Sequence, residues 1–278
     1  MRTARKTIAL VLLVAFPACD NPAAPPLPDG AVAFAAPAVY QRWWQIVEEC
    51  SGRTGLLAAV HFYEMPGTLF SPINGESLAG FWTAAGNRIV LKGGLRYDGG
   101  TVRHEMLHAL LGNGSHPHAV FLGACAGVVG CSIECAADGG PTPTPDPSAV
   151  TVNSGAIQVS ITIEPAAPSV LHGDGFFELV VTAKNPASHS VIVSFPTSGT
   201  PYSFAYGLRE PSGLGSFGGV IVYDETEKWF SAGETKKHVF DVSMMPGVGD
   251  IIAHSGTYSA WGEYAHMASA TIDLVVNP

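Results

Sequence analysis

Residues 157–276 alternate between apolar and polar side chains with a period of two, and this pattern restricts the fold of the chain more than any other feature. The first run places isoleucine or valine at positions 157, 159, 161 and 163, with polar residues between them. Further runs follow at residues 177–183, 191–195, 202–206, 219–223, 237–242, 257–264 and 270–276. Successive side chains of a β-strand point to opposite faces, so each run predicts a strand with one buried face. Many short strands separated by turn residues are typical of an antiparallel β-sandwich.

A run rich in proline, threonine and glycine lies before this pattern, at residues 138–147. It holds no large apolar residue, so it cannot contribute to a packed core, and its prolines favour an extended, semi-rigid conformation. We therefore predict that the chain is divided here into two domains, which suits a length of 278 residues.

The first residues have the composition of an export signal. Arg2, Arg5 and Lys6 precede an apolar run of nine residues, 8–16, which is too short to span a bilayer. The segment that ends at Cys19 resembles a bacterial lipoprotein signal. This resemblance implies that Cys19 is lipidated and that the Pro/Ala-rich residues after it form a tether to a membrane of the cell envelope. The alternative is an ordinary cleaved signal and a secreted protein.

Composition restricts the partners. Hydrophobic residues make up 47% of the chain and charged residues 13%, which excludes a disordered protein. The net charge of −9 argues against nucleic acid, because phosphate contacts need clustered lysine and arginine. We expect a monomer that contacts a membrane through its lipid anchor. The predicted organisation is a signal peptide at 1–19, a tether at 20–36, an α+β domain at 37–137, a linker at 138–149 and an all-β domain at 150–278.

The cysteines support export. Apart from Cys19, the chain has Cys50, Cys125, Cys131 and Cys135. An even number in an oxidising compartment predicts two disulfides, for which three pairings exist. We favour Cys50–Cys125 with Cys131–Cys135. The alternative is a zinc knuckle built from the last three cysteines, although their spacings are not the usual CxxC pairs.

Four elements are expected in the first domain. They are a helix at 39–50, strands at 58–63 and 88–92, and a helix at 102–111 with Thr101 as its N-cap and Gly112 as its C-terminal stop.

The last of these helices contains the sequence His104-Glu105-Met106-Leu107-His108. Histidines four residues apart lie on one helix face, so both rings can reach a single metal ion. Zinc accepts neutral imidazole nitrogens, and the neighbouring Glu105 can take a proton from a zinc-activated water. These are the groups needed to hydrolyse a peptide bond. The alternative is a helix that carries two surface histidines and a glutamate.

Over residues 40–137, the succession of strand, turn and HExxH helix resembles the zincin metallopeptidases. The resemblance implies a zincin-like catalytic domain in which His104 and His108 bind Zn²⁺, Glu105 is the general base, and the substrate is a peptide or protein. The metzincin branch has HExxHxxGxxH, whereas Gly112 here comes one residue late and His116 two residues late. We favour His116 as the third ligand. His118 and Glu134 are the alternatives.

The second half resembles the β-sandwich of intracellular proteinase inhibitor-like domains at residues 180–185, 195–199, 231–235 and 256–258. Because many Ig-like modules share this pattern, the resemblance implies an Ig-like antiparallel sandwich more than it implies inhibition. Three functions follow as hypotheses. The first is an exported zinc peptidase, the second is a non-catalytic surface lipoprotein with a structural metal site, and the third is a protease-binding module formed by residues 148–278.

Overall fold

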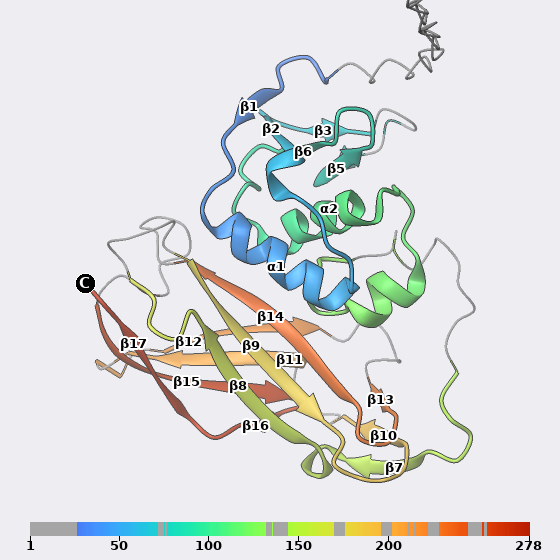
Figure 1. The fold of residues 1–278 in the computed structure, drawn as a ribbon. Helices are drawn as coiled ribbons and strands as arrows, with labels where there is room; N and C mark the ends of the chain where they lie inside the picture. Colours follow the sequence, from blue (N-terminus) through green and yellow to red (C-terminus); the bar gives the residue numbers. More distant parts are fainter. Residues whose placement is uncertain are drawn as a thin grey trace, which may run out of the picture.

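The computed structural model describes residues 27–71, 75, 77–131, 135, 144–169, 176–195, 202–210, 212–213, 215–221, 228–243, 252 and 255–278. Within them the protein is mostly β-sheet, with few helices (Figure 1). The predicted signal peptide, Cys19 and Glu134 lie outside the described residues, as do parts of the predicted tether and linker. No described helix has the length and apolar content needed to span a membrane.

The first half contains a four-stranded mixed sheet and two α-helices. In spatial order the strands are β1 (Val32–Phe34), β2 (His61–Met65), β6 (Arg88–Lys92) and β5 (Gly80–Thr83). Strands β2 and β6 are parallel, and the two outer strands pair antiparallel to them. The other elements are α1 (Val39–Ser51), α2 (Gly99–Leu111), a small hairpin of β3 (Leu69–Phe70) and β4 (Ser77–Leu78), a 3₁₀ helix (Leu57–Ala59) and a π-helix (Ala119–Ala124).

The predicted helix at 39–50 and the predicted strand at 88–92 are confirmed. The strand predicted at 58–63 is wrong at its start, because residues 57–59 form a 3₁₀ turn and the strand begins at His61. Leu57, Ala58 and Ala59 lack the β-branched side chains that favour strands. The prediction of a plain tether up to residue 36 also fails in part, since residues 32–34 pair with β2 as an edge strand.

Helix α2 ends as predicted, but it begins earlier. Gly112 takes a left-handed conformation with φ of 62°, which stops the helix. The predicted N-cap Thr101 is wrong. The cap is Asp98, whose carboxylate accepts a hydrogen bond from the Thr101 backbone N–H at 2.8 Å. This satisfies one of the N–H groups that the first helical turn leaves without a partner, and it places negative charge at the positive end of the helix dipole.

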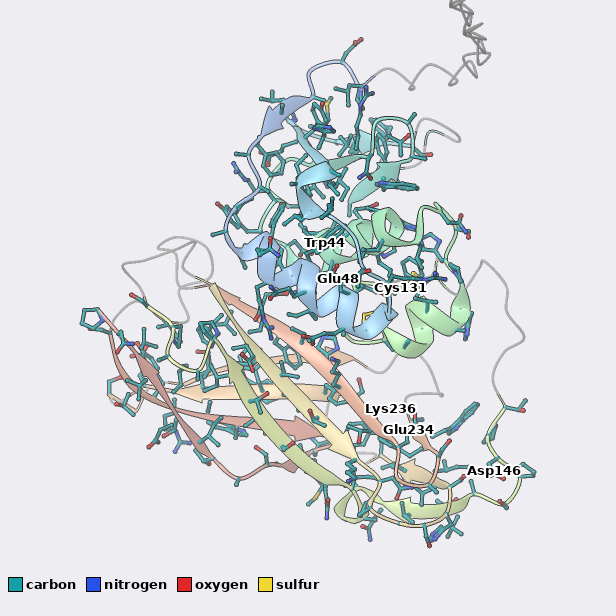
Figure 2. The ribbon with its side chains drawn as sticks, in the orientation of Figure 1. Trp44, Glu48, Cys131, Asp146, Glu234 and Lys236 are labelled. Atoms are coloured by element: carbon teal, nitrogen blue, oxygen red, sulfur yellow. A yellow bond between two sulfur atoms is a disulfide. The ribbon has the colours of Figure 1, made fainter. Side chains whose placement is uncertain are left out.

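Helix α1 contributes several buried aromatic side chains to the core of this half. Tyr40, Trp43 and Trp44 are buried, and Trp43 stacks on Tyr40. The chain that leaves α1 folds back on it: the Trp44 indole donates to the Gly55 carbonyl, and the Glu48 carboxylate accepts from the Gly55 N–H (Figure 2). Side chains on one face of α1 therefore fix the path toward β2.

Both favoured disulfide pairings are confirmed. Cys50, near the end of α1, is bonded to Cys125, just after the π-helix, and Cys131 is bonded to Cys135. The alternative zinc knuckle is wrong, because sulfurs joined in a disulfide cannot bind zinc as thiolates.

The described residues of the second half form three β-sheets. One has the order β14 (Thr235–Ser243), β9 (Phe176–Lys184), β8 (Gln158–Glu164). The largest has the order β12 (Gly215–Ile221), β11 (Tyr202–Arg209), β15 (Gly256–Tyr264), β16 (Met267–Ala268), with β17 (Ile272–Val276) also on β15. The third joins β13 (Trp229–Phe230), β10 (Val191–Ser194) and β7 (Val150–Asn153). A 3₁₀ turn (Ser154–Ala156) follows β7.

The alternation that predicted these strands corresponds to burial. In β9, Phe177, Leu179, Val181 and Ala183 all point into one core. The arrangement is not wholly antiparallel, because β7 pairs parallel with β10. A hairpin joins only antiparallel neighbours, whereas β7 enters from the residues after the proline-rich segment and can take either direction.

The two halves are in contact. Strand β14 lies beside α1 and the residues that follow the π-helix (Figure 1), and Val239 of β14 is buried in the core of the first half. The Val239 N–H donates to the Gly127 carbonyl at 2.8 Å. The Arg103 guanidinium in α2 pairs with the Asp241 carboxylate in β14 through two hydrogen bonds, of 2.7 and 2.9 Å.

Candidate metal centre

Helix α2 places His104 and His108 one turn apart on its buried side. Their exposed fractions are 8% and 4%, and their Nε2 atoms lie 3.1 Å apart. The helix stops three residues after His108, because the left-handed Gly112 turns the chain away from the helix axis. The two rings therefore lie on the last turns of the helix, where the segment after Gly112 can reach them.

That segment brings His116 to the same point. The Asn113 side chain accepts from the Ser115 backbone N–H at 3.0 Å, which tightens the turn after Gly112. His116 Nε2 then lies 3.1 Å from His104 Nε2. The three histidines form one group in which one ring nitrogen of each lies within 4.8 Å of those of the other two.

Backbone carbonyls determine the tautomers of the two helical histidines. His104 Nδ1 lies 2.6 Å from the Gly130 carbonyl oxygen, and His108 Nδ1 lies 2.8 Å from the Asn113 carbonyl oxygen. A carbonyl only accepts hydrogen bonds, so in a neutral ring each Nδ1 carries the proton and each Nε2 presents a lone pair. Two such lone pairs facing each other at 3.1 Å repel unless a cation or a proton lies between them.

The spacing suits a zinc ion. Two nitrogens bound at about 2.0–2.1 Å to a tetrahedral centre are separated by about 3.3 Å, close to the separations that the histidines already have. Three neutral imidazoles form a donor set that zinc accepts while it keeps one position open. Zinc-bound histidines commonly donate their second ring N–H to a carbonyl, as His104 and His108 do here.

Phe121, on the π-helix, forms an apolar wall beside the three rings. Its ring centroid lies 5.1 Å from that of His104, 4.9 Å from that of His108 and 4.9 Å from that of His116. It is fully buried. The wall restricts the rings to edge-on and tilted contacts and removes water from one side of the group, which strengthens electrostatic interactions there.

Glu105 is also buried, with 4% of its surface exposed. It lies against Gly80, the first residue of β5, where a Cβ atom would stand 3.0 Å from Glu105 Oε1 and 3.1 Å from its Cγ. The absence of a side chain at Gly80 thus makes room for the carboxyl group. Strand β5 is the last strand of its sheet, so the edge of the sheet borders the residue beside the histidines.

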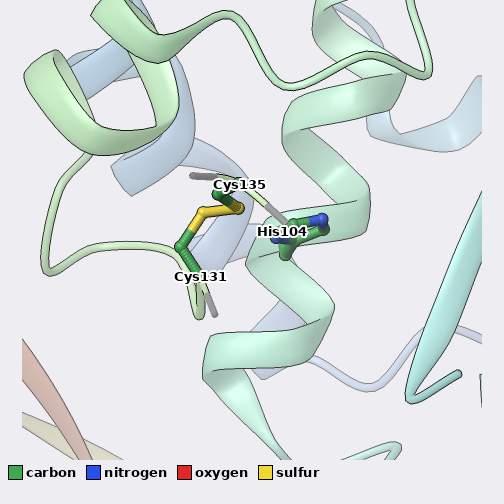
Figure 3. Close-up of side chains that lie close together, drawn as sticks. All are labelled: His104, Cys131 and Cys135. Atoms are coloured by element: carbon green, nitrogen blue, oxygen red, sulfur yellow. A yellow bond between two sulfur atoms is a disulfide. The ribbon is translucent and has the colours of Figure 1, made fainter. Parts of the chain in front are cut away.

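A second group of possible ligand atoms combines His104 with Cys131 and Cys135. Figure 3 shows these two cysteines beside His104, joined by a disulfide. Because the disulfide removes their thiolates, the three histidines are the set that fits zinc. His118 lies at the start of the π-helix and belongs to neither group found among the described residues. Glu134 lies outside the described residues.

Sequence reasoning missed Phe121, Gly80, and the carbonyl groups of Gly130 and Asn113. The apolar run at 119–124 shortly after the motif was the one available signal for Phe121. The carbonyls have no sequence signal, since every residue has one.

Comparisons with known proteins identify no family. No family model matches the chain, and no curated protein matches it. Among solved structures, the chain is weakly similar to the Pseudomonas fluorescens alkylpurine DNA glycosylase AlkC, at 10% identity over 44% of this chain and 31% of that one, with a TM-score of 0.30. It is similar at the same level to a β-glucosidase from Listeria innocua (11% identity, 44% of this chain, 16% of that one, TM-score 0.27). The chain therefore spans under a third of these proteins, and TM-scores this low establish neither a fold nor a function.

Proposed function

We propose that this protein is a zinc-dependent peptidase with a zincin-like catalytic domain, followed by an Ig-like β-sandwich. His104, His108 and His116 are its zinc ligands, and Glu105 is its general base. The proposal is carried by the convergence of His104, His108 and His116 at one point. In two of them, His104 and His108, Nδ1 is hydrogen-bonded to a backbone carbonyl. That arrangement leaves lone pairs directed at one another, and a bound cation relieves their repulsion.

The residues of this chain have separable roles in such a reaction. Zinc, when bound, supplies the Lewis acidity that activates a water molecule and polarises a carbonyl group. Glu105 takes the proton of the attacking water and passes it to the amine that leaves. The Gly130 and Asn113 carbonyls hold His104 and His108 in the tautomer that binds metal. A purely structural zinc site needs no buried carboxylate next to its first ligand, so Glu105 favours catalysis.

A peptide is the substrate that the surroundings of the site favour. Strand β5 is an edge strand, and edge strands can pair with an extended chain through backbone hydrogen bonds. Gly80 at the start of β5 contacts Glu105, so a peptide paired along this edge would pass beside the general base. Backbone pairing accepts many sequences, which suits a peptidase.

Replacement of the general base tests the proposal. The purified mature protein should hold one zinc per chain and cleave a generic unfolded protein near neutral pH, and a chelator should abolish the cleavage. Glu105→Ala should retain zinc by metal analysis and lose about 10²–10⁴-fold in kcat, because it removes the base and no ligand. The matched control is Glu49→Ala, an exposed glutamate on α1, which should keep full activity. Cleavage by Glu105→Ala at the rate of wild type would contradict the mechanism.

We further propose that the protein is exported and anchored to a membrane of the cell envelope through lipid on Cys19. The two disulfides are compatible with export. Cys19→Ser should move the protein from the membrane fraction to the soluble fraction, because acyl chains provide about 0.8 kcal/mol of membrane affinity per buried CH₂. If the distribution between fractions does not change, the chain is not anchored through this cysteine.

A further inference from the structure

The loop at residues 126–130 connects the metal centre to the second half of the protein. At one end of this loop, the Gly130 carbonyl accepts the hydrogen bond from His104 Nδ1 that orients the ring. The Gly130 N–H donates to the Gly100 carbonyl in the first turn of α2. The position of this loop therefore determines whether His104 presents Nε2 to the metal.

Arg103 ties the middle of the loop to strand β14. It precedes His104 in the chain and has 1% of its side chain exposed. Its Nε donates to the Val128 carbonyl, while its two terminal nitrogens bind the two oxygens of Asp241 in β14. A bidentate pair of this kind fixes the plane of the guanidinium, which in turn fixes the direction of the Nε donor toward the loop.

A second link joins the start of the loop to the same strand. The Val239 N–H of β14 donates to the Gly127 carbonyl at 2.8 Å. Gly127 has a φ of +71° and lies so close to the backbone of Lys237 and His238 that a Cβ atom there would overlap it. The Val239 side chain is buried in the core of the first half. Strand β14 thus contacts the loop through backbone, side chain and charge.

From these contacts we propose that strand β14 of the second half positions the zinc ligand His104 through the loop at residues 126–130, with Arg103 and Asp241 as positioning residues. The second half then contributes to the geometry of the metal centre. The inference rests on the proposed function, since it concerns a ligand of the proposed zinc site.

Asp241→Asn tests the proposal in the full mature chain. The substitution keeps the shape of the side chain and removes the charge that orients Arg103. Partners that orient zinc ligands typically contribute 10–100-fold to metal affinity, so we expect the zinc dissociation constant, measured by competition with a chromophoric chelator, to rise about tenfold or more. The absorption spectrum of the Co²⁺-substituted protein should also change, because the ligand geometry changes. In the metal-free protein, hydrogen exchange of the 126–130 amides should accelerate.

Two control variants separate positioning from general stability. Asp273→Asn makes the same change at an exposed site on β17 and should leave zinc affinity unchanged. Val193→Ala weakens the separate core of the second half, in which Val193 is buried, and should lower the unfolding temperature without changing zinc affinity or the Co²⁺ spectrum.

The proposal is overturned if Asp241→Asn binds zinc as wild type does with unchanged exchange of the loop amides, or if Val193→Ala weakens zinc binding equally. A wild-type protein that binds no zinc would contradict the proposed function. The exchange measurement on the metal-free protein would still show whether β14 holds the loop.

Discussion

His116 and His118 are two residues apart, yet only His116 joins the group formed with His104 and His108. Pro117 between them restricts His116 to an extended conformation, and the π-helix begins just after His118. The chain therefore changes direction between the two histidines. Substituting each histidine in turn therefore tests which of the two rings binds the metal.

We expect His116→Ala to weaken zinc binding and His118→Ala to leave it within about twofold. Structural zinc sites with four ligands bind with about 10–16 kcal/mol, so one ligand corresponds to about 3 kcal/mol, or roughly 100-fold in affinity. Zinc titration against a chelator of known affinity measures both. A larger loss for His118→Ala than for His116→Ala would move the third ligand to His118.

The sequence predicts part of this site and not the rest, for a physical reason. His104, Glu105 and His108 lie in one helical turn, so their proximity follows from helix geometry alone. The proximity of Phe121 to the rings, and of Gly80 to Glu105, depends on how separate elements pack. Such contacts leave no periodic pattern in the sequence.

The same distinction separates the strands that the sequence predicts from those that it does not. The nine-residue strand β9 buries Phe177, Leu179, Val181 and Ala183 at every second position, which produces a readable alternation. Strands β13 and β16 have two residues each, too few for any period. Strand β1 is held to β2 by backbone pairing at a sheet edge, and backbone groups place little demand on side-chain type.

The contact that joins the two halves of the protein is charged as well as apolar. Arg103 and Asp241 are 138 residues apart in the chain, so no local pattern predicts their pairing. Arg42 of α1 also lies 3.7 Å from Glu178 of β9, next to this pair. Charges buried at such a contact shift the protonation of their neighbours, which makes the stability of the molecule depend on pH.

Two groups near this contact have shifted pKa values, and the two shifts change the free energy of unfolding in opposite directions as the pH rises. Burial, helped by the nearby Asp241 carboxylate and opposed by Arg103 and Arg42, raises the pKa of Glu178 from 4.5 to about 7. Burial, helped by the charge of Arg103, lowers the pKa of His238 from 6.5 to about 4.

The direction of each contribution follows from proton binding. Between about pH 4.5 and 7 the folded protein holds a proton on Glu178 that the unfolded chain has lost, so the free energy of unfolding falls as pH rises. Between about pH 4 and 6.5 the unfolded chain holds a proton on His238 that the folded protein lacks, so the free energy of unfolding rises with pH. In the wild type the two slopes oppose each other where these ranges overlap.

Single substitutions should therefore reveal slopes that the wild type hides. In Glu178→Gln, the free energy of unfolding should increase from pH 4 to 6.5 and stay level toward pH 7.5, and relative to wild type the variant should gain about 3 kcal/mol across pH 4.5–7. His238→Phe keeps an aromatic ring beside Phe204 and Phe240. In this variant only the Glu178 slope remains, so the free energy of unfolding should fall across pH 4.5–7. Urea unfolding with disulfides intact and EDTA present, so that zinc binding adds no slope of its own, measures all three proteins. If the free energy of unfolding depends on pH in the same way in both variants and in wild type, then neither pKa differs between the folded and unfolded states.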